Sequence, residues 1–276
     1  MKDAEIRKSV REGYGKIAVE GGSCCGENKS CCCNSKQSPA DISKSIGYTD
    51  EDINSVPDGA NLGLGCGNPL ALASLKEGET VIDLGSGAGF DCFLAANRVG
   101  KRGKVIGVDM TPEMLEKARE NARKNNYANV EFRLGEIENL PVADNTADVI
   151  ISNCVINLSV DKDRVFREAF RVLKPGGRLM VSDIVLEKEL PVFVRESIQA
   201  YIGCIAGAML ENDYLGAIEN AGFQEVRVAD ETGIVVDSLD NDPVAESIAE
   251  SLKLTEEQMR DLAGSIKSIK VSAIKP

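Results

Sequence analysis

Nine cysteines and no histidine set the chemistry that this chain of 276 residues can perform. Cysteine occurs at four separated places that could act together: the run Cys31-Cys32-Cys33, then Cys66, Cys154 and Cys204. A chain without histidine has no imidazole base, no Ser-His-Asp triad and no imidazole ligand for a metal. Thiols and carboxylates must therefore do the chemistry, together with any cofactor that the chain binds.

Three of these cysteines have neighbours that favour a binding role. Cys66 lies between two glycines, in a turn that no apolar core requires, and Cys204 is flanked by small residues that leave room beside its sulfur. Cys154 follows the strand expected at 147–152, and ligands of such sheets bind at the carboxyl ends of the strands. We predict that all three bind substrate.

The remaining cysteines have more than one interpretation. Cys92 lies within an apolar helical pattern, where cysteine usually behaves as a small buried hydrophobe. The cysteines between residues 24 and 33 could form an unstructured tract that scavenges metal, or a zinc site, although adjacent cysteines suit tetrahedral zinc less well than Cys-x-x-Cys spacing. We predict that one of residues 31–33, Cys32, is functional.

A glycine-rich loop predicts a nucleotide-like cofactor. Asp83 ends an apolar strand pattern, and Gly85-x-Gly87-x-Gly89 leads into a helical one. Glycines let backbone amides approach a ligand where a Cβ would collide. Asp109, at the end of the next expected strand, suits the ribose diol of either NAD or S-adenosylmethionine. The loop by itself leaves both cofactors open.

Further features favour S-adenosylmethionine. Asp83 suits a cationic amino-acid group better than a pyrophosphate. Residues 135–141 are similar to the loop that borders the adenine in class I methyltransferases, and residues 173–177 are similar to a turn of the same enzymes. The residues predicted to bind the cofactor are Asp83, Gly85, Ser86, Gly87, Gly89, Asp109, Met110, Gly135, Glu136, Ile137 and Asn153.

Alternating strand and helix patterns position these residues. Strands are expected at 80–84, 104–109, 130–134, 147–152 and 178–185, and helices at 91–99, 112–125 and 163–173. This order predicts an α/β fold, a Rossmann-like, doubly wound parallel sheet. We expect N-terminal helices with a cysteine-rich loop (1–69), a cofactor-binding domain (70–225) and a small α+β accessory region (226–276).

The composition of the chain indicates which binding partners and which cellular compartment to expect. The net charge of −12 opposes binding to nucleic acid or to anionic lipid. The sequence has no apolar run long enough to cross a membrane, and its start has no apolar core of a signal peptide. We therefore expect a cytoplasmic protein with reduced thiols, no nucleic acid partner and no membrane partner.

Four segments together resemble the arsenite S-adenosylmethionine methyltransferases: 65–67, 83–89, 107–111 and 152–158, in a resemblance that covers most of residues 5–225. It implies methylation of arsenite and methylarsenite for detoxification. As(III) would be held by Cys66, Cys154 and Cys204, with one of residues 31–33 as a fourth cysteine. Cysteine pairs would supply electrons, and a thioredoxin- or glutathione-type reductant would reverse the disulfide. The chain departs from the family pattern in two places. It has three adjacent cysteines, at residues 31–33, where the pattern has its first cysteine, and it has Leu64 where many relatives carry an aromatic residue.

Two other functions remain open at this point. A class I methyltransferase could act on a small organic acceptor such as a quinone or sterol carbon. A binding protein could instead sequester thiophilic metalloids without consuming cofactor.

Overall fold

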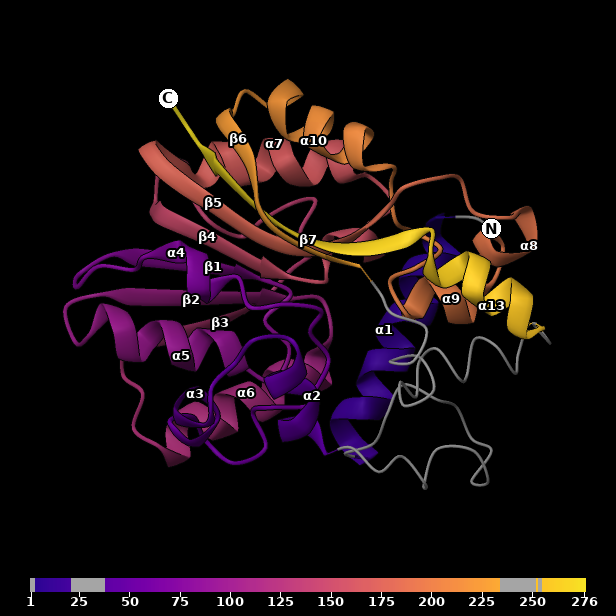
Figure 1. Ribbon diagram of the computed structural model, residues 1–276. Helices are drawn as coiled ribbons and strands as arrows, with labels where there is room; N and C mark the ends of the chain where they lie inside the picture. The colour runs from indigo at the N-terminus through magenta and orange to yellow at the C-terminus, as the bar shows by residue number, and fades with distance from the viewer. Residues whose placement is uncertain (1–2, 21–37, 234–251, 253–254) are drawn as a thin grey trace.

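The computed structural model describes residues 3–20, 38–233, 252 and 255–276, and its centre is one twisted sheet (Figure 1). The strands are β1 (Thr80–Leu84), β2 (Lys104–Asp109), β3 (Val130–Leu134), β4 (Ala147–Asn153), β5 (Leu173–Leu186), β6 (Gln224–Gly233) and β7 (Ile266–Ile274). Their spatial order is β3-β2-β1-β4-β5-β7-β6. The expected doubly wound α/β fold is confirmed.

The five strands expected between residues 80 and 185 are parallel, as predicted, but the whole sheet is mixed, because β7 of the expected accessory region joins it. Strands β1 to β5 pair in parallel, whereas β7 pairs antiparallel with both β5 and β6. The chain's last strand therefore runs between two strands that share the opposite direction. An alternation of helix and strand patterns carries no signal for one reversed strand, because direction is set by pairing between distant segments.

Helices cover both faces of the sheet (Figure 1). The helices are α1 (Asp3–Glu20), α2 (Pro39–Ser45), α3 (Asp50–Asn54), α4 (Leu70–Ala73), α5 (Phe90–Val99), α6 (Pro112–Lys124), α7 (Lys162–Val172), α8 (Val192–Arg195), α9 (Ile198–Ile202), α10 (Glu211–Asn220) and α13 (Glu256–Ala263), with a 3₁₀ turn at Ile156–Leu158. Buried side chains of α4, α5 and α6 form one core cluster with the sheet, and those of α7 and α10 form another. None of the described helices is long and apolar enough to cross a membrane.

Local sequence signals explain where two of these helices form. Helix α6 begins at Pro112, whose fixed φ suits the first helical position, and its apolar residues face the sheet. Helix α7 buries Val165, Phe166, Ala169 and Val172, a spacing that places all four on one face. These burial patterns fix both helices against opposite sides of the sheet.

The segment 174–177 differs from its prediction as a turn before the strand. It lies within β5, because Leu173 already pairs with Ala147, and the ladder then resumes with Arg178 beside Val149. The intervening residues form an irregularity, and Gly176 supplies its positive φ of 76°. Strand β5 is accordingly longer than expected, 14 residues rather than eight.

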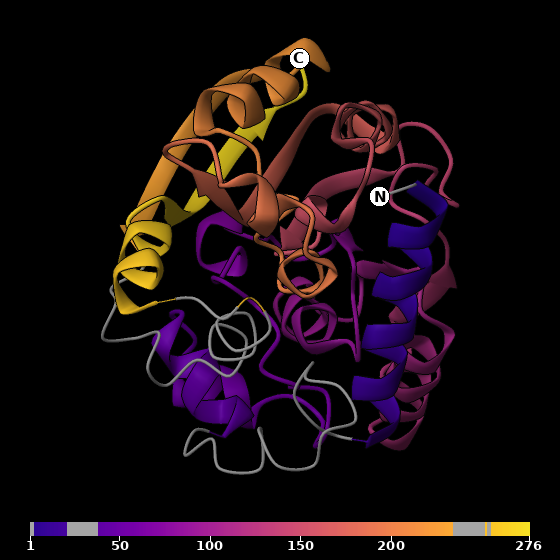
Figure 2. The ribbon, with the colours of Figure 1, turned by 90° about the vertical axis from the view of Figure 1, so that its right-hand side faces the viewer.

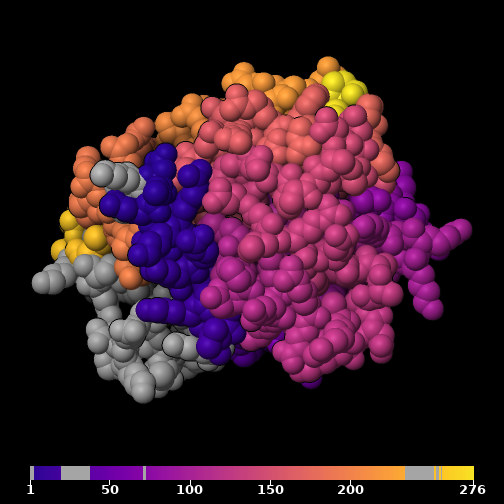
Figure 3. Space-filling model, turned by 180° about the vertical axis from the view of Figure 1, so that it is seen from behind, coloured from indigo at the N-terminus to yellow at the C-terminus, as the bar shows by residue number. Residues whose placement is uncertain are grey.

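The ends of the chain flank this core. Helix α1 packs against α6 and α9 (Figures 2 and 3), so it spans two parts of the molecule that are distant in sequence. Strands β6 and β7 continue the central sheet, so the boundary expected at residue 226 runs through β6. The expected α+β accessory region contains α13 and the strands β6 and β7, and the stretch 234–251 lies outside the described residues.

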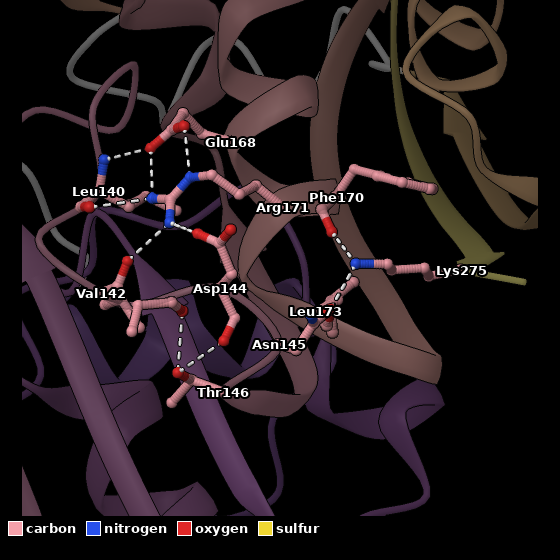
Figure 4. A network of polar contacts seen from close by, with 11 residues as sticks. Leu140, Val142, Asp144, Asn145, Thr146, Glu168, Phe170, Arg171, Leu173 and Lys275 are labelled. Carbon is pink, nitrogen blue, oxygen red and sulfur yellow. Dashed lines mark hydrogen bonds and ion pairs between the residues drawn. The ribbon is translucent and has the colours of Figure 1, made fainter.

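Polar contacts hold the amino-terminal ends of β4 and β5 (Figure 4). Lys275 Nζ donates to the carbonyl oxygens of Phe170 (2.8 Å) and Leu173 (2.7 Å) and to Asn145 Oδ1 (2.9 Å). Arg171 forms ion pairs with Glu168 and Asp144 and donates to two backbone carbonyls. Each cation here has several acceptors.

Candidate active site

The loop after β1 is arranged around Asp109. Gly87 N donates to Asp109 Oδ2 (2.9 Å), and Thr111 N donates to Asp109 Oδ1 (2.8 Å). Gly85 and Gly87 have positive φ values of 70° and 51°, which favour glycine. A Cβ at Gly85 would collide with Val155, whereas the space around Gly87 is open. The loop therefore presents backbone to an open space next to a carboxylate.

A cavity of about 140 Å³ lies beside this loop, at the carboxyl ends of β1, β2 and β4. Most of the residues predicted to bind the cofactor line it: Asp83, Gly85, Ser86, Gly87, Asp109, Met110, Gly135, Ile137 and Asn153. Two predicted residues do not. Gly89 is the N-cap of α5, and Glu136 is exposed, with its carboxylate 4.0 Å from Arg7 Nε.

Buried carboxylates give this cavity a negative character. Burial raises the pKa of Asp83, Asp91 and Asp109, to about 6 for Asp91, and neighbouring carboxylates raise that of Asp83 further. Their hydrogen bonds come from neutral donors, among them Tyr48 Oη to Asp91 (2.6 Å) and Cys92 Sγ to Asp83 (3.2 Å). A ligand carrying positive charge would relieve this repulsion.

These features fit S-adenosylmethionine. Its sulfonium and ammonium groups are cationic, and its ribose offers hydroxyl donors that a carboxylate can accept. Ser86 Oγ is buried without a hydrogen-bond partner among the described residues, as expected of a group that a ligand would satisfy. The open space at Gly87 adds a place where a ligand can approach backbone amides.

Asn153 connects the cavity to the loop that carries Cys66. Its Nδ2 donates to Gly67 O (2.8 Å) and to Asp91 Oδ2 (3.2 Å), and its Oδ1 accepts from Cys66 N (3.1 Å). The glycines on either side of Cys66 have a steric cause: a Cβ on Gly65 would lie 2.6 Å from Asn153 Nδ2, and one on Gly67 would overlap Ser182 Oγ. Only a glycine-flanked loop can approach β4 and β5 this closely.

The structure brings the three separated cysteines together. Cys66 Sγ donates to Ser182 O (3.7 Å), Cys154 N donates to the same oxygen (2.8 Å), and Cys204 Sγ donates to Cys154 O (3.0 Å). Cys154 and Cys204 are 7% and 5% exposed, and both have left-handed backbone (φ 57° and 63°). Such conformations are costly for non-glycine residues and concentrate at functional sites.

The environment of Cys154 and Cys66 raises the pKa of both thiols and keeps them protonated at neutral pH. Hydrogen bonds with Cys204 and Cys66 hold the pKa of Cys154 well above its usual range, and burial adds to the effect. Burial also raises the pKa of Cys66. The other predicted cysteine, Cys32, lies outside the described residues, and Cys92 is fully buried, as expected for a residue of the core.

Sequence reasoning missed two residues beside the thiols. Asp183 is 1% exposed, and its carboxylate oxygen lies within 4.8 Å of the sulfurs of Cys66 and Cys154. An acidic residue within an otherwise apolar strand was the available signal. Tyr14 of α1 is the other: its hydroxyl donates to Ile202 O (3.3 Å) and lies 4.0 Å from Cys204 Sγ.

Comparison with known proteins agrees with this geometry. Residues 75–222 match the family model described as a methyltransferase domain. An X-ray structure of an arsenic(III) S-adenosylmethionine methyltransferase from Chlamydomonas reinhardtii superposes with a TM-score of 0.65 and 33% identity, covering 85% of this chain and 73% of that one. Fold and cavity thus define a class I methyltransferase.

The arsenite methyltransferase of Halobacterium salinarum is 53% identical over 232 residues, 82% of this chain and 59% of that protein. The arsenite methyltransferase of Aquipseudomonas alcaligenes is 36% identical over 253 residues, 89% of this chain and 69% of that protein. The chain belongs to the arsenite methyltransferase family. It spans about three fifths of the length of the Halobacterium relative.

Proposed function

We propose that this protein methylates trivalent arsenic with S-adenosylmethionine and thereby takes part in arsenic detoxification. The observation that carries the proposal is the convergence of Cys66, Cys154 and Cys204 beside the cavity that the predicted cofactor-binding residues line. Arsenite and methylarsenite are the substrates, and the three sulfurs hold As(III). Thiolates are soft ligands that suit a thiophilic centre.

The raised pKa values of Cys66 and Cys154 suit arsenite as the species that binds. Arsenite carries three hydroxyl groups, and each can leave as water with one thiol proton when an As–S bond forms. The exchange needs no free thiolate and no separate base. The raised pKa of Cys154 is therefore no obstacle to binding, and it keeps the empty site from carrying several buried charges.

The residues of the cavity bind and orient the cofactor, which supplies an electrophilic methyl group when bound. Asp109 would accept from the ribose hydroxyls, the backbone of the loop from Gly85 to Gly87 would lie against the cofactor, and Asp83 would balance its positive charge. Arsenic bound to three sulfurs retains its own lone pair, so no side chain has to remove a proton from the nucleophile. A chain without histidine can therefore be competent.

The proposal extends to the partners of the reaction. Methylation makes arsenic formally pentavalent, and a pair of cysteines returns it to the trivalent state by forming a disulfide. Cys32 is the expected fourth cysteine. A thioredoxin- or glutathione-type thiol then reduces the disulfide, which places the enzyme in the reducing cytoplasm.

The decisive experiment incubates the protein with arsenite, S-adenosylmethionine and a dithiol, and separates the arsenic species by chromatography with mass detection. Methylated arsenic from the parent chain, and none from Cys154→Ser, is the expected result. Binding of arsenite without cofactor turnover would instead identify a sequestering protein. Consumption of cofactor with an organic acceptor that survives both Cys66→Ser and Cys154→Ser would identify a methyltransferase of another substrate class.

A further inference from the structure

Three potential ligand atoms meet at the ends of β4 and β5. The sulfurs of Cys66 and Cys154 and a carboxylate oxygen of Asp183 all lie within 4.8 Å of one another. Cys204 lies next to this group but is not part of it, and its thiol donates to Cys154 O (3.0 Å). Cys66 remains partly exposed, which provides a route for entry.

Asp183 is held in one orientation by three donors. Asn157 Nδ2 (2.9 Å) and Ile184 N (3.0 Å) donate to Oδ1, and Tyr214 Oη (3.2 Å) donates to Oδ2. Oδ2 accepts this one bond and retains a lone pair. Carboxylates that bind metals are typically oriented by such outer hydrogen bonds.

Three sulfurs and a carboxylate oxygen are more ligand atoms than As(III) needs. Arsenic in a pyramid of three sulfurs uses the thiols alone and leaves the carboxylate without a role. A divalent cation with a filled d shell has no lone pair and takes a fourth donor, commonly in a tetrahedron of sulfur and carboxylate ligands. Sulfurs about 2.3 Å from zinc stand roughly 3.8 Å apart in a tetrahedron. The sulfurs of Cys66 and Cys154 lie within 4.8 Å of each other, so shifts of about 1 Å suffice for these two, and the Cys204 side chain has to move toward them to complete the site.

We propose that Cys66, Cys154, Cys204 and Asp183 form a four-donor site for a thiophilic divalent cation of the Zn²⁺ and Cd²⁺ class. Binding forms three metal–sulfur bonds and one metal–oxygen bond, and the three thiol protons pass to the solvent. The cation excludes As(III) because it occupies the same sulfurs. Asp183 distinguishes the two ligands, since only the cation uses its oxygen.

The test measures Cd²⁺ and Zn²⁺ binding by equilibrium dialysis in the full chain with residues 24, 25, 31, 32 and 33 changed from cysteine to serine, so that thiols of that tract do not contribute. We expect one ion per chain, with a cadmium–thiolate absorption band for Cd²⁺. Cys154→Ser should abolish binding. Asp183→Asn should weaken the affinity for the cation about tenfold or more and leave the affinity for arsenite unchanged. Asp148→Asn, at the opposite end of the sheet, is the matched control and should bind as the parent does.

Two results would overturn the site. One is an affinity of Asp183→Asn for Cd²⁺ equal to that of the parent, with its fold verified by circular dichroism. The other, which needs no variant, is X-ray absorption of the zinc-loaded parent that shows no sulfur neighbours or no oxygen neighbour. Arsenite binding is measured separately, so loss of the arsenic function with retained cation binding would contradict the proposed function and leave this site standing.

Discussion

The two ends of the central sheet differ in how their charged side chains are bonded. At the amino-terminal end, Lys275 and Arg171 each have several oxygen acceptors, and the acids beside them are paired (Figure 4). At the carboxyl end, Asp83 and Asp183 are buried and Asp109 is partly buried, and all three accept hydrogen bonds from neutral groups. One end is complete as it stands, whereas the other is completed by a ligand.

The pKa values of the acidic side chains differ between the two ends in the same way. Hydrogen bonds from Arg171 hold the pKa of Glu168 below its usual range, whereas burial raises the pKa of Asp183 to about 7. Ionised Glu168 therefore stabilises the fold, and ionised Asp183 costs stability. The comparison shows that the buried carboxylates beside the thiols accept hydrogen bonds from neutral groups, whereas the acids in the network of Figure 4 are paired with a cation.

The largest effect on activity is expected from Cys154, at the carboxyl end of the sheet. Cys154→Ser removes the sulfur that contacts both other thiols, so arsenite methylation should fall about 100-fold or more because the substrate is no longer held in place. Arsenic speciation measures the rate, and circular dichroism verifies the fold. Cys92→Ser is the control for arsenic stoichiometry, since Cys92 is buried away from the three thiols. Turnover of Cys154→Ser at the parent rate would contradict the thiolate site.

The amino-terminal end should respond in stability alone. Lys275→Met leaves Phe170 O and Leu173 O without their donor, so the free energy of unfolding should fall by about 2–4 kcal/mol. Urea unfolding measures the loss. The folded variant should bind S-adenosylmethionine and arsenite as the parent does. A weakened affinity for arsenite would show that the amino-terminal end of the sheet also affects the thiol site, and would contradict this prediction.

The pH dependence of stability should have opposite signs at the two ends. The unfolded carboxyl ionises near pH 3.8, but folded Asp183 stays protonated up to about pH 7, so its contribution to stability falls as the pH rises through this window. Asp183→Asn should remove a loss on the order of 2–3 kcal/mol between pH 4 and 8, measured by urea unfolding.

Glu168→Gln serves as the contrast to this variant. Because the pKa of Glu168 is lowered on folding, the variant should be less stable than the parent at neutral pH, and the gap should close as the pH falls below the unfolded value near 4.5. Equal pH profiles for the two variants would refute the distinction between the ends.

The cofactor side should show a smaller effect. Asp109→Ala removes an acceptor that also holds the amides of Gly87 and Thr111, so the affinity for S-adenosylmethionine should weaken by about 1–3 kcal/mol. Isothermal titration measures it, with Asp109→Asn expected to lie between the variant and the parent. An unchanged dissociation constant would exclude Asp109 from the cofactor site.

The mildest effect is expected from the cysteine run at residues 31–33. Three adjacent thiols can replace one another, so single serine variants should be nearly as active as the parent. The triple variant should perform the first methylation and slow in the later ones. Speciation over time, begun separately from arsenite and from methylarsenite, separates these steps. Parent rates from both substrates would leave the run without a role.

Local patterns in the sequence were enough to predict much of this molecule. The strand and helix ranges between 80 and 134 agree with the structure within a residue or so, because apolar runs, Thr111-Pro112 and the glycine loop act over a few residues. The family was recognisable for the same reason, since its signatures are short contiguous segments.

The sequence by itself determined which groups are available for chemistry and which helices and strands carry them: thiols without histidine, and a glycine-rich cofactor loop. Only the tertiary structure decided that β7 runs in reverse beside β5, that Ser182 O receives contacts from both Cys66 and Cys154, and that Asp183 joins them. These arrangements depend on pairing and packing between segments that lie far apart in the sequence, as Cys66 and Ser182 do, which are 116 residues apart. No pattern within a few residues encodes such distances, so the meeting of the site's parts follows from the folded sheet.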